Sequence, residues 1–305
     1  MKPSPRRGRR SADAAGENDR AAATPAAARR VGRRAVTRVM IGIIAVVGSV
    51  ATMLASRSAA AAAVSLTNGT IVDLSYAYDE TTIFWPTEEG FKLEREHGEV
   101  TEKGYYYASN KFCTPEHGGT HIDAPLHFNA AGKSVDALPL EQLIGDAVVV
   151  DVSDIVADKP DYQVRVPDLR TWESAHGRIP HHAIVLLRTG FGKRWPDRAT
   201  YLGTDERGAG GVAKLHFPGL HPDAARWLVS EREINAVGID TASIDYGQST
   251  MFESHVALFA QGVPAFENLA NLDRVPARGA TVIALPMKIR GGSGGPLRII
   301  AVVPR

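Results

Sequence analysis

The sequence predicts a mixed α/β domain, and three observations support this prediction. Short runs rich in Val, Ile and Leu recur after residue 66, and their length is typical of strands. Segments with helical spacing and turns rich in Gly and Pro separate these runs. No change of composition marks a second domain, and no internal repeat is visible. We therefore expect one domain over residues 64–305 and a separate segment over residues 1–63.

Two helices and five strands can be placed in this domain. Residues Pro222–Glu231 are expected to form a helix, because a proline suits its first turn and Leu228 completes an apolar face. A second helix is expected after Met251, where His255 and Leu258 lie at helical spacing. The expected strands are Asp146–Val152, His182–Thr189, Asn235–Asp240, Ala280–Leu285 and Leu297–Val303.

The first 63 residues have the pattern of an export signal. Residues 1–34 are rich in Ala, Arg and Pro and are expected to be disordered. The apolar run Val39–Ala55 follows, and the small residues after it predict cleavage near Ala60–Val64. An uncleaved membrane anchor is the alternative, because the 17 residues of this run are just long enough to span a bilayer. Arg33-Arg34 would suit a twin-arginine export route, so we expect a secreted or extracytoplasmic protein.

The distribution of charge disfavours several classes of partner. Residues 1–63 contain 12 Lys and Arg against 3 Asp and Glu, whereas the remainder contains 23 against 31. A folded region this acidic is a poor ligand for nucleic acid or anionic membranes, whose affinity for proteins comes mainly from Lys and Arg. Cys113 is the only cysteine, so an intramolecular disulfide and a multi-cysteine zinc site are both excluded.

The residues with the clearest chemistry lie between His117 and His127, in the pattern H-x3-H-x-D-x3-H. The spacing of His117 and His121 would suit one face of a helix, but the glycines between them and the nearby Pro125 disfavour a helix. In an extended segment, His121, Asp123 and His127 would share one face. The glycines would then let His117 fold back toward them.

Neutral imidazole and carboxylate are the ligands that borderline metal ions such as zinc prefer. A catalytic site needs few protein ligands and an open position for water, and His117, His121 and Asp123 meet this requirement. Histidines that only form hydrogen bonds within a turn are the alternative, but that would usually explain one or two of them. The sequence therefore predicts a divalent metal site here.

This segment resembles the signature H-x-G-T-H-x-D-x-P-x-H of the cyclase family of metal-dependent hydrolases, which includes bacterial kynurenine formamidase and isatin hydrolase. The resemblance extends from about Leu66 to the C-terminus. Its motifs are the complete signature His117–His127, followed by Phe128, the residues Asp73-Leu74-Ser75 and Trp85-Pro86, the segment Gly238–Asp245, and His255 with Glu267 in Phe266-Glu267-Asn268-Leu269.

The resemblance implies a set of roles for these residues. His117, His121 and Asp123 would bind one metal ion, and Asp123 with His255 and Glu267 would bind a second. Zinc and manganese both occur in the family, and the number of ions stays open. It also implies a compact α/β fold around a small β-barrel-like mixed sheet with flanking helices, usually as a homodimer.

His127 is expected to act as a catalytic acid and base beside the metal, a role that suits a pKa near neutrality. The alternative is that His127 is a fourth metal ligand. Phe84 and Trp85 are expected to line an aromatic substrate pocket, although aromatic residues more often belong to the core.

The expected activity is metal-dependent hydrolysis of an amide, lactam or lactone carbonyl in a small cyclic or aromatic molecule. An export signal favours an isatin-like lactam over N-formylkynurenine, whose breakdown is intracellular. An arylformamidase remains one alternative. An exported protein that binds metal or ligand without catalysis is the other, and the presence of His127 argues against it.

Overall fold

The computed structural model describes residues 69–305. The export segment predicted for residues 1–63 lies outside these residues. Among the described residues, no helix combines the length and the apolar character needed to cross a membrane.

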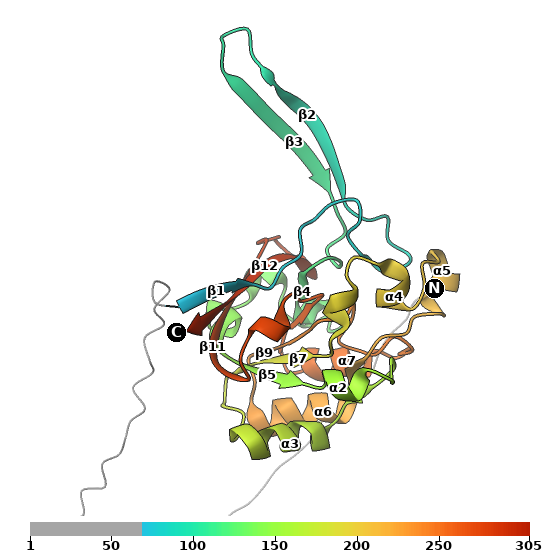
Figure 1. The fold of residues 1–305 in the computed structure, drawn as a ribbon, viewed down its shortest axis with the longest axis vertical. Coiled ribbons are helices and arrows are strands. Elements are labelled where there is room, and N and C mark those ends of the chain that lie inside the picture. The colour runs from blue at the N-terminus through green and yellow to red at the C-terminus, as the bar shows by residue number, and fades with distance from the viewer. Residues whose placement is uncertain (1–68) are drawn as a thin grey trace, which may run out of the picture. The chain divides into compact units, whose positions relative to one another are not determined.

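A closed ring of seven strands forms the centre of the domain (Figure 1), in the order β12-β11-β5-β7-β9-β10-β4 and back to β12. An eighth strand, β1, pairs with β12 from outside the ring. The ring is therefore the small mixed barrel that the resemblance implies. Its strands and β1 are β1 (Gly69–Asp73), β4 (His121–Asp123), β5 (Ile144–Asp151), β7 (Ile184–Arg188), β9 (Ala236–Ile239), β10 (Ala265–Glu267), β11 (Arg278–Pro286) and β12 (Gly294–Pro304).

The last strand of the chain closes this ring. The beginning of β12, Gly294–Pro296, pairs antiparallel with β4, and its end pairs with β1. The opposite edge of β12 pairs with β11 between Thr281 and Pro286. Two strands therefore share one edge of β12, and the shorter of them, β4, is held between β12 and β10.

Alternation along the central strands produces two hydrophobic cores. In β5, Ala147 and Val149 face the interior of the barrel, whereas Val148 and Val150 pack in the other core. The strand β7 alternates in the same way. This two-residue period follows from the pleat of a strand, and it explains the continuous apolar runs that predicted these strands.

Helices cover the outer side of β5, β7 and β9 (Figure 1). The five predicted strands are confirmed within about two or three residues at each end. The helix predicted for Pro222–Glu231 is helical throughout. Its α-helical part covers Pro222–Trp227, and a π-helical turn follows over Leu228–Arg232. The helices are α1 (Leu140–Leu143), α2 (Ser153–Val156), α3 (Val166–His176), α4 (Arg198–Leu202), α5 (Gly208–Val212), α6 (Pro222–Trp227) and α7 (Glu253–Phe259).

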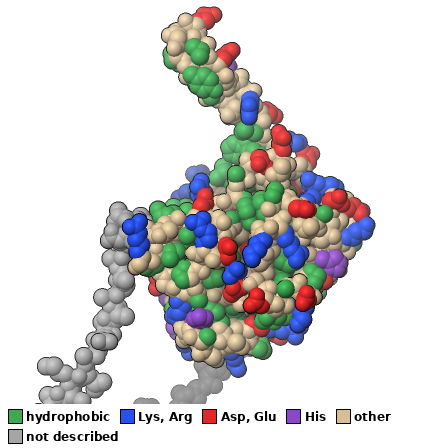
Figure 2. All heavy atoms as spheres, in the orientation of Figure 1, with side chains coloured by type: hydrophobic (Ala, Val, Ile, Leu, Met, Phe, Trp, Pro, Cys, Tyr) green, Lys and Arg blue, Asp and Glu red, His purple; other side chains and the backbone are tan. Residues whose placement is uncertain are grey.

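The strands β2 (Lys92–Val100) and β3 (Tyr106–Cys113) form a hairpin that projects from the barrel (Figures 1 and 2). The sequence analysis did not predict it, because β2 is mostly charged and lacks the apolar density of the buried strands. A second small sheet pairs β6 (Gln163–Val164) with β8 (Gly219–Leu220).

Candidate active site

The strands β4 and β10 hold three of the predicted metal ligands. They pair antiparallel, with Glu267 directly opposite His121. Because side chains alternate along a strand, His121 and Asp123 lie on the face opposite to Ile122, which packs in the barrel interior. His121, Asp123 and Glu267 are all buried. The structure thus brings together residues that are more than 140 positions apart in the sequence.

His127 reaches the same site by a different path from the one predicted. The extended segment does not continue to His127, because β4 ends at Asp123 and a 3-10 turn follows over Pro125–His127. Pro125 has no N–H to offer a neighbouring strand, which explains the change. The turn still places the ring of His127 over that of His117, with 3.8 Å between ring centroids.

The glycine pair does bring His117 back to the site. Gly118 and Gly119 both have positive φ angles, 149° and 57°. A side chain at Gly118 would also overlap the ring of Phe84, since a Cβ atom there would lie 2.0 Å from Phe84 Cδ1. Glycine is required here for both backbone conformation and space.

The hydrogen bonds of three histidines fix which ring nitrogen carries the proton. His121 Nδ1 donates to the carbonyl oxygen of Gly119 at 3.0 Å, and His255 Nδ1 donates to Asp245 Oδ2 at 2.6 Å. For His117, the ring nitrogen Nε2 lies 2.9 Å from Ser293 Oγ. That hydroxyl donates its own proton to a carboxylate oxygen of Glu116 at 2.6 Å, so it accepts from His117.

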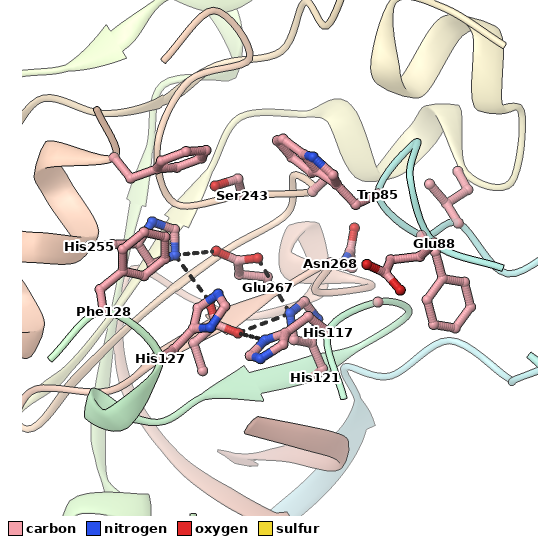
Figure 3. Close-up of a pocket in the computed structure, with 16 residues that line it drawn as sticks. Trp85, Glu88, His117, His121, His127, Phe128, Ser243, His255, Glu267 and Asn268 are labelled. Atoms are coloured by element: carbon pink, nitrogen blue, oxygen red, sulfur yellow. Dashed lines mark hydrogen bonds and ion pairs between the residues drawn. The ribbon is translucent and has the colours of Figure 1, made fainter. Parts of the chain in front are cut away.

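The other nitrogen of each of these rings faces a carboxylate (Figure 3). Asp123 Oδ1 lies 2.6 Å from His117 Nδ1 and 3.1 Å from His121 Nε2. His255 Nε2 lies 3.0 Å from Asp123 Oδ2 and 3.1 Å from a Glu267 oxygen. A neutral imidazole presents a lone pair there, and a lone pair facing a carboxylate needs a positive charge between them. The donor set therefore fits a divalent cation.

Among the residues that the structure describes, two groups of side chains have ligand atoms close enough to hold an ion, and Asp123 belongs to both. One group is His117, Asp123 and His127, and the other is His121, Asp123 and Glu267, with all ligand atoms of a group within 4.8 Å of one another. These two groups differ from the two ligand sets that the family resemblance implied. The five predicted ligands nevertheless lie together in one cluster. His127 joins them at the exposed side of the cluster.

The pKa values of the cluster show the same excess of negative charge. Burial lowers the pKa of His121, but Asp123, Glu267 and the hydrogen bond to Gly119 together raise it to about 9. The pKa of Glu267 is raised, first by burial and then by the charge of Asp123. His127 differs: removal of water around its ring lowers its pKa to about 4, helped by the nearby imidazoles and opposed by Asp123. It is therefore neutral at pH 7, with a pKa well below the value near neutrality that its predicted role suggested.

The cluster opens into an apolar pocket of about 260 Å³. This volume suits a small ring system rather than a drug-sized ligand. Phe84 and Trp85 both line this pocket, and Phe84 is 2% exposed. The other apolar side chains of its wall are Ile83, Phe128, Ala242 and Phe252.

Several polar residues of the site were not identified from the sequence. Glu88, Ser243 and Asn268 line the pocket (Figure 3). Asp245 and Ser293 lie behind the histidines and hold their protonated nitrogens. Asp245 stands at the end of a motif that we quoted without a role, and Ser293 lies in the run Gly291–Gly295. Only their three-dimensional contacts reveal what they do.

Comparison with known proteins agrees with this geometry. The family model Cyclase, described as "Putative cyclase", matches residues 72–246. A curated isatin hydrolase from Roseibium aggregatum is 35% identical over 216 residues, which is 68% of this chain and 79% of that protein.

The chain belongs to the cyclase family of metal-dependent hydrolases.

Two further members of this family resemble the chain over most of its length. The structure of isatin hydrolase A from Labrenzia aggregata, bound to benzyl benzoate, superposes with a TM-score of 0.70 at 36% identity. The match covers 77% of this chain and 94% of the isatin hydrolase chain. A kynurenine formamidase from Salinibacter ruber is 29% identical, over 75% of this chain and 96% of that protein. The family and the fold that the sequence analysis predicted are confirmed.

Proposed function

We propose that this cyclase-family hydrolase opens a small cyclic amide, with an isatin-like lactam as its leading substrate. The observation that carries the proposal is the convergence of three imidazole nitrogens on Asp123 and Glu267 at the base of an apolar pocket. Similarity to isatin hydrolases at 35–36% identity supports the substrate class.

The predicted residues would hold the metal as follows. His117, His121, Asp123, His255 and Glu267 would bind one or two divalent ions, zinc or manganese. Such an ion, when bound, activates water and polarises a carbonyl oxygen. The protein arranges the donors for this task, since each imidazole donates its other N–H away from the cluster.

His127 would move the proton. Within residues 69–305 neither of its ring nitrogens makes a hydrogen bond to the protein, and the ring lies at the exposed side of the cluster. A neutral imidazole in this position accepts a proton at its free nitrogen and delivers it to the leaving nitrogen of the amide.

The pocket supports recognition of a ring with a polar edge. Phe84, Trp85 and Phe128 offer flat apolar surfaces to an aromatic ring. Ser243 accepts from the backbone N–H of Asp245 at 3.3 Å, so its hydroxyl proton is available for an oxygen of the substrate. Glu88 provides a carboxylate at the pocket, which would accept a hydrogen bond from a lactam N–H.

The test uses the full chain. Bound metals are measured by elemental analysis, and hydrolysis of isatin, N-formylkynurenine and simple lactones is followed after loading with zinc or manganese. We expect faster hydrolysis of isatin than of N-formylkynurenine. The reverse preference would make the protein an arylformamidase, an alternative that the similarity to kynurenine formamidases favours. Bound metal without any hydrolysis would leave the non-catalytic binding protein.

A homodimer is also part of the proposal, and the β2–β3 hairpin supports it. Strand pairing places Leu93 opposite Phe112 and Val100 opposite Tyr106, so all four share one face. They are 49–66% exposed, although such a face is normally covered. Light scattering should show a dimer, and replacing Leu93 and Phe112 by Ser should weaken it. Tyr107→Ser on the opposite face is the control; equal effects of both changes would argue against this interface.

The place of action is proposed from the sequence alone. The basic and apolar segments of residues 1–63 support export from the cytoplasm, by a twin-arginine or another route. N-terminal sequencing of the protein from its native cells tests this, since retention of Val39–Ala55 would indicate a membrane anchor.

A further inference from the structure

The carbonyl oxygen of Gly119 decides how His121 is protonated. It can only accept, so His121 Nδ1, at 3.0 Å, is the nitrogen that carries the proton. In the neutral ring, His121 Nε2 is left with its lone pair, 3.1 Å from Asp123 Oδ1 and 3.5 Å from Glu267 Oε2. If this carbonyl turned away, the other tautomer would become available, and Nε2 would no longer be a ligand.

Asn268 holds that carbonyl in place. Its side-chain Nδ2 donates to the oxygen of Gly119 at 2.7 Å. The main chain of Asn268 is itself fixed, because its N–H donates to Thr241 at 2.9 Å and its carbonyl accepts from Thr120 Oγ1 at 2.7 Å. Its φ of 54° is a left-handed conformation that Asn tolerates better than most residues.

Tyr201 holds the other end of the Asn268 amide. The Tyr201 hydroxyl donates to Asn268 Oδ1 at 2.9 Å, and a second acceptor, the carbonyl of Asp240, lies at 3.2 Å. Tyr201 is completely buried, and burial raises its pKa well above the ordinary value, so the hydroxyl keeps its proton. Both ends of the Asn268 amide are therefore held, Oδ1 by Tyr201 and Nδ2 by Gly119.

We propose that Tyr201 and Asn268 are positioning residues, which act through the Gly119 carbonyl to keep His121 Nε2 available for the metal. Neither residue is a ligand, and Tyr201 lies on α4, outside every motif of the sequence. This inference rests on the proposed function in one respect, that a divalent cation binds at His121. The two residues control the affinity of the site for that cation.

The substitution Tyr201→Phe removes only the hydroxyl. It leaves the ring, whose centroid lies 5.4 Å from the ring centroid of Trp195. The buried Asn268 Oδ1 then loses its donor, and the amide is held by its bond to Gly119 alone. Asn268→Leu removes the donor outright. Tyr162→Phe is the matched control, because this hydroxyl also donates to one side chain, Asp168 at 2.8 Å, in another part of the domain.

The experiment measures the dissociation constants of zinc and manganese for the full chain by chelator competition. We expect Tyr201→Phe and Asn268→Leu each to weaken binding by about 10- to 100-fold, the usual effect of losing a residue that orients a metal ligand. The double variant should lose little more than Asn268→Leu alone, since both changes break one chain of contacts. Tyr162→Phe should bind metal as the wild type does.

A second measurement separates this inference from the proposed function. Nitrogen NMR of His121 in the metal-free protein, in alkaline buffer where the ring is neutral, reports the tautomer directly. We expect the Nδ1–H form in the wild type and a mixture in Tyr201→Phe. An unchanged tautomer and unchanged metal affinity in Tyr201→Phe would overturn the inference, even if its melting temperature fell. If the wild-type protein binds no metal, but Tyr201→Phe still changes the tautomer of His121, only the proposed function is refuted.

Discussion

The carboxylate of Asp245 accepts two hydrogen bonds from His255, one from its backbone N–H at 3.1 Å and one from its ring Nδ1–H at 2.6 Å. It also accepts from the backbone N–H of Ser254 at 3.0 Å, at the beginning of α7. One buried carboxylate therefore caps a short helix and fixes the orientation of an imidazole at the metal cluster.

Asp245→Asn should weaken metal binding by about 10- to 100-fold, because an amide can turn its NH2 group toward His255 and oppose the required tautomer. Dissociation constants of zinc and manganese measure this. Asp161→Asn is the control, since Asp161 accepts from His216 at 2.8 Å in an exposed pair outside the cluster. Equal losses in both variants would show that the effect is general rather than local.

His121→Ala and Asp123→Ala should each abolish both bound metal and activity. Each change removes a donor atom from the buried cluster, and Asp123 belongs to both candidate ligand groups. Elemental analysis of the purified variants is the measurement, with His216→Ala as a histidine control. A variant that keeps full metal content would show that the residue is not a ligand.

His127→Ala should keep its metal but lose about 10²- to 10⁴-fold in kcat, the usual cost of removing a general acid or base. The loss should appear in kcat more than in KM, because the proton moves in the transition state. Metal content decides between the two roles of His127. If the variant empties the site as His121→Ala does, His127 is a ligand.

Gly118→Ala should impair the pocket, since the new methyl group would overlap the ring of Phe84. Overpacking of this kind costs about 1–3 kcal/mol, and a displaced Phe84 should raise KM for isatin. Gly104→Ala is the control: Gly104 also has a positive φ, 83°, but a Cβ atom there meets nothing within 4 Å. Similar KM values for both variants would mean that Phe84 does not contact the substrate.

Acid stability should depend on Glu173. Its carboxylate accepts from Arg232 Nε at 2.7 Å, and the two side chains are 14% and 10% exposed. The Arg232 hydrogen bond outweighs burial and lowers the pKa of Glu173. The stability from this pair is therefore present above the ordinary glutamate pKa and is lost as the pH falls through the lowered value.

Glu173→Gln should accordingly lower the melting temperature at pH 7, where the loss of a charged hydrogen bond costs about 2 kcal/mol. The difference from wild type should shrink in acid as the native Glu173 becomes protonated. Thermal unfolding at several pH values measures it. Asp223→Asn, in an exposed pair with Arg226, should change little at any pH.

The sequence predicted the parts of the fold that follow from local rules. The buried strands carry continuous apolar runs, and the histidine segment carries its ligands within eleven residues. The 3-10 turn at His127 was missed because a strand pattern continued past Pro125, although the missing N–H of that proline could have indicated the end of β4.

The remaining site residues could not be predicted for a different reason. Asn268 stands in a motif that the sequence analysis quoted without giving it a role, and Tyr201 lies 67 positions away, outside every motif. Their function depends on one contact of 2.9 Å that the folded domain creates. Ser293 likewise lies in a glycine-rich run that indicates a turn, while its contact with His117 spans 176 positions. Local patterns contain no information about such pairs.

The pairing of β4 with the beginning of β12 also ties the ligand strand to a distant part of the chain. Gly294 pairs with Asp123 and Pro296 with His121, and the backbone N–H of Ala124 donates to Ser293 at 2.8 Å. None of the proposed ligands lies on β12, yet a proteolytic cut or a destabilising change in this strand should reach the ligand strand directly.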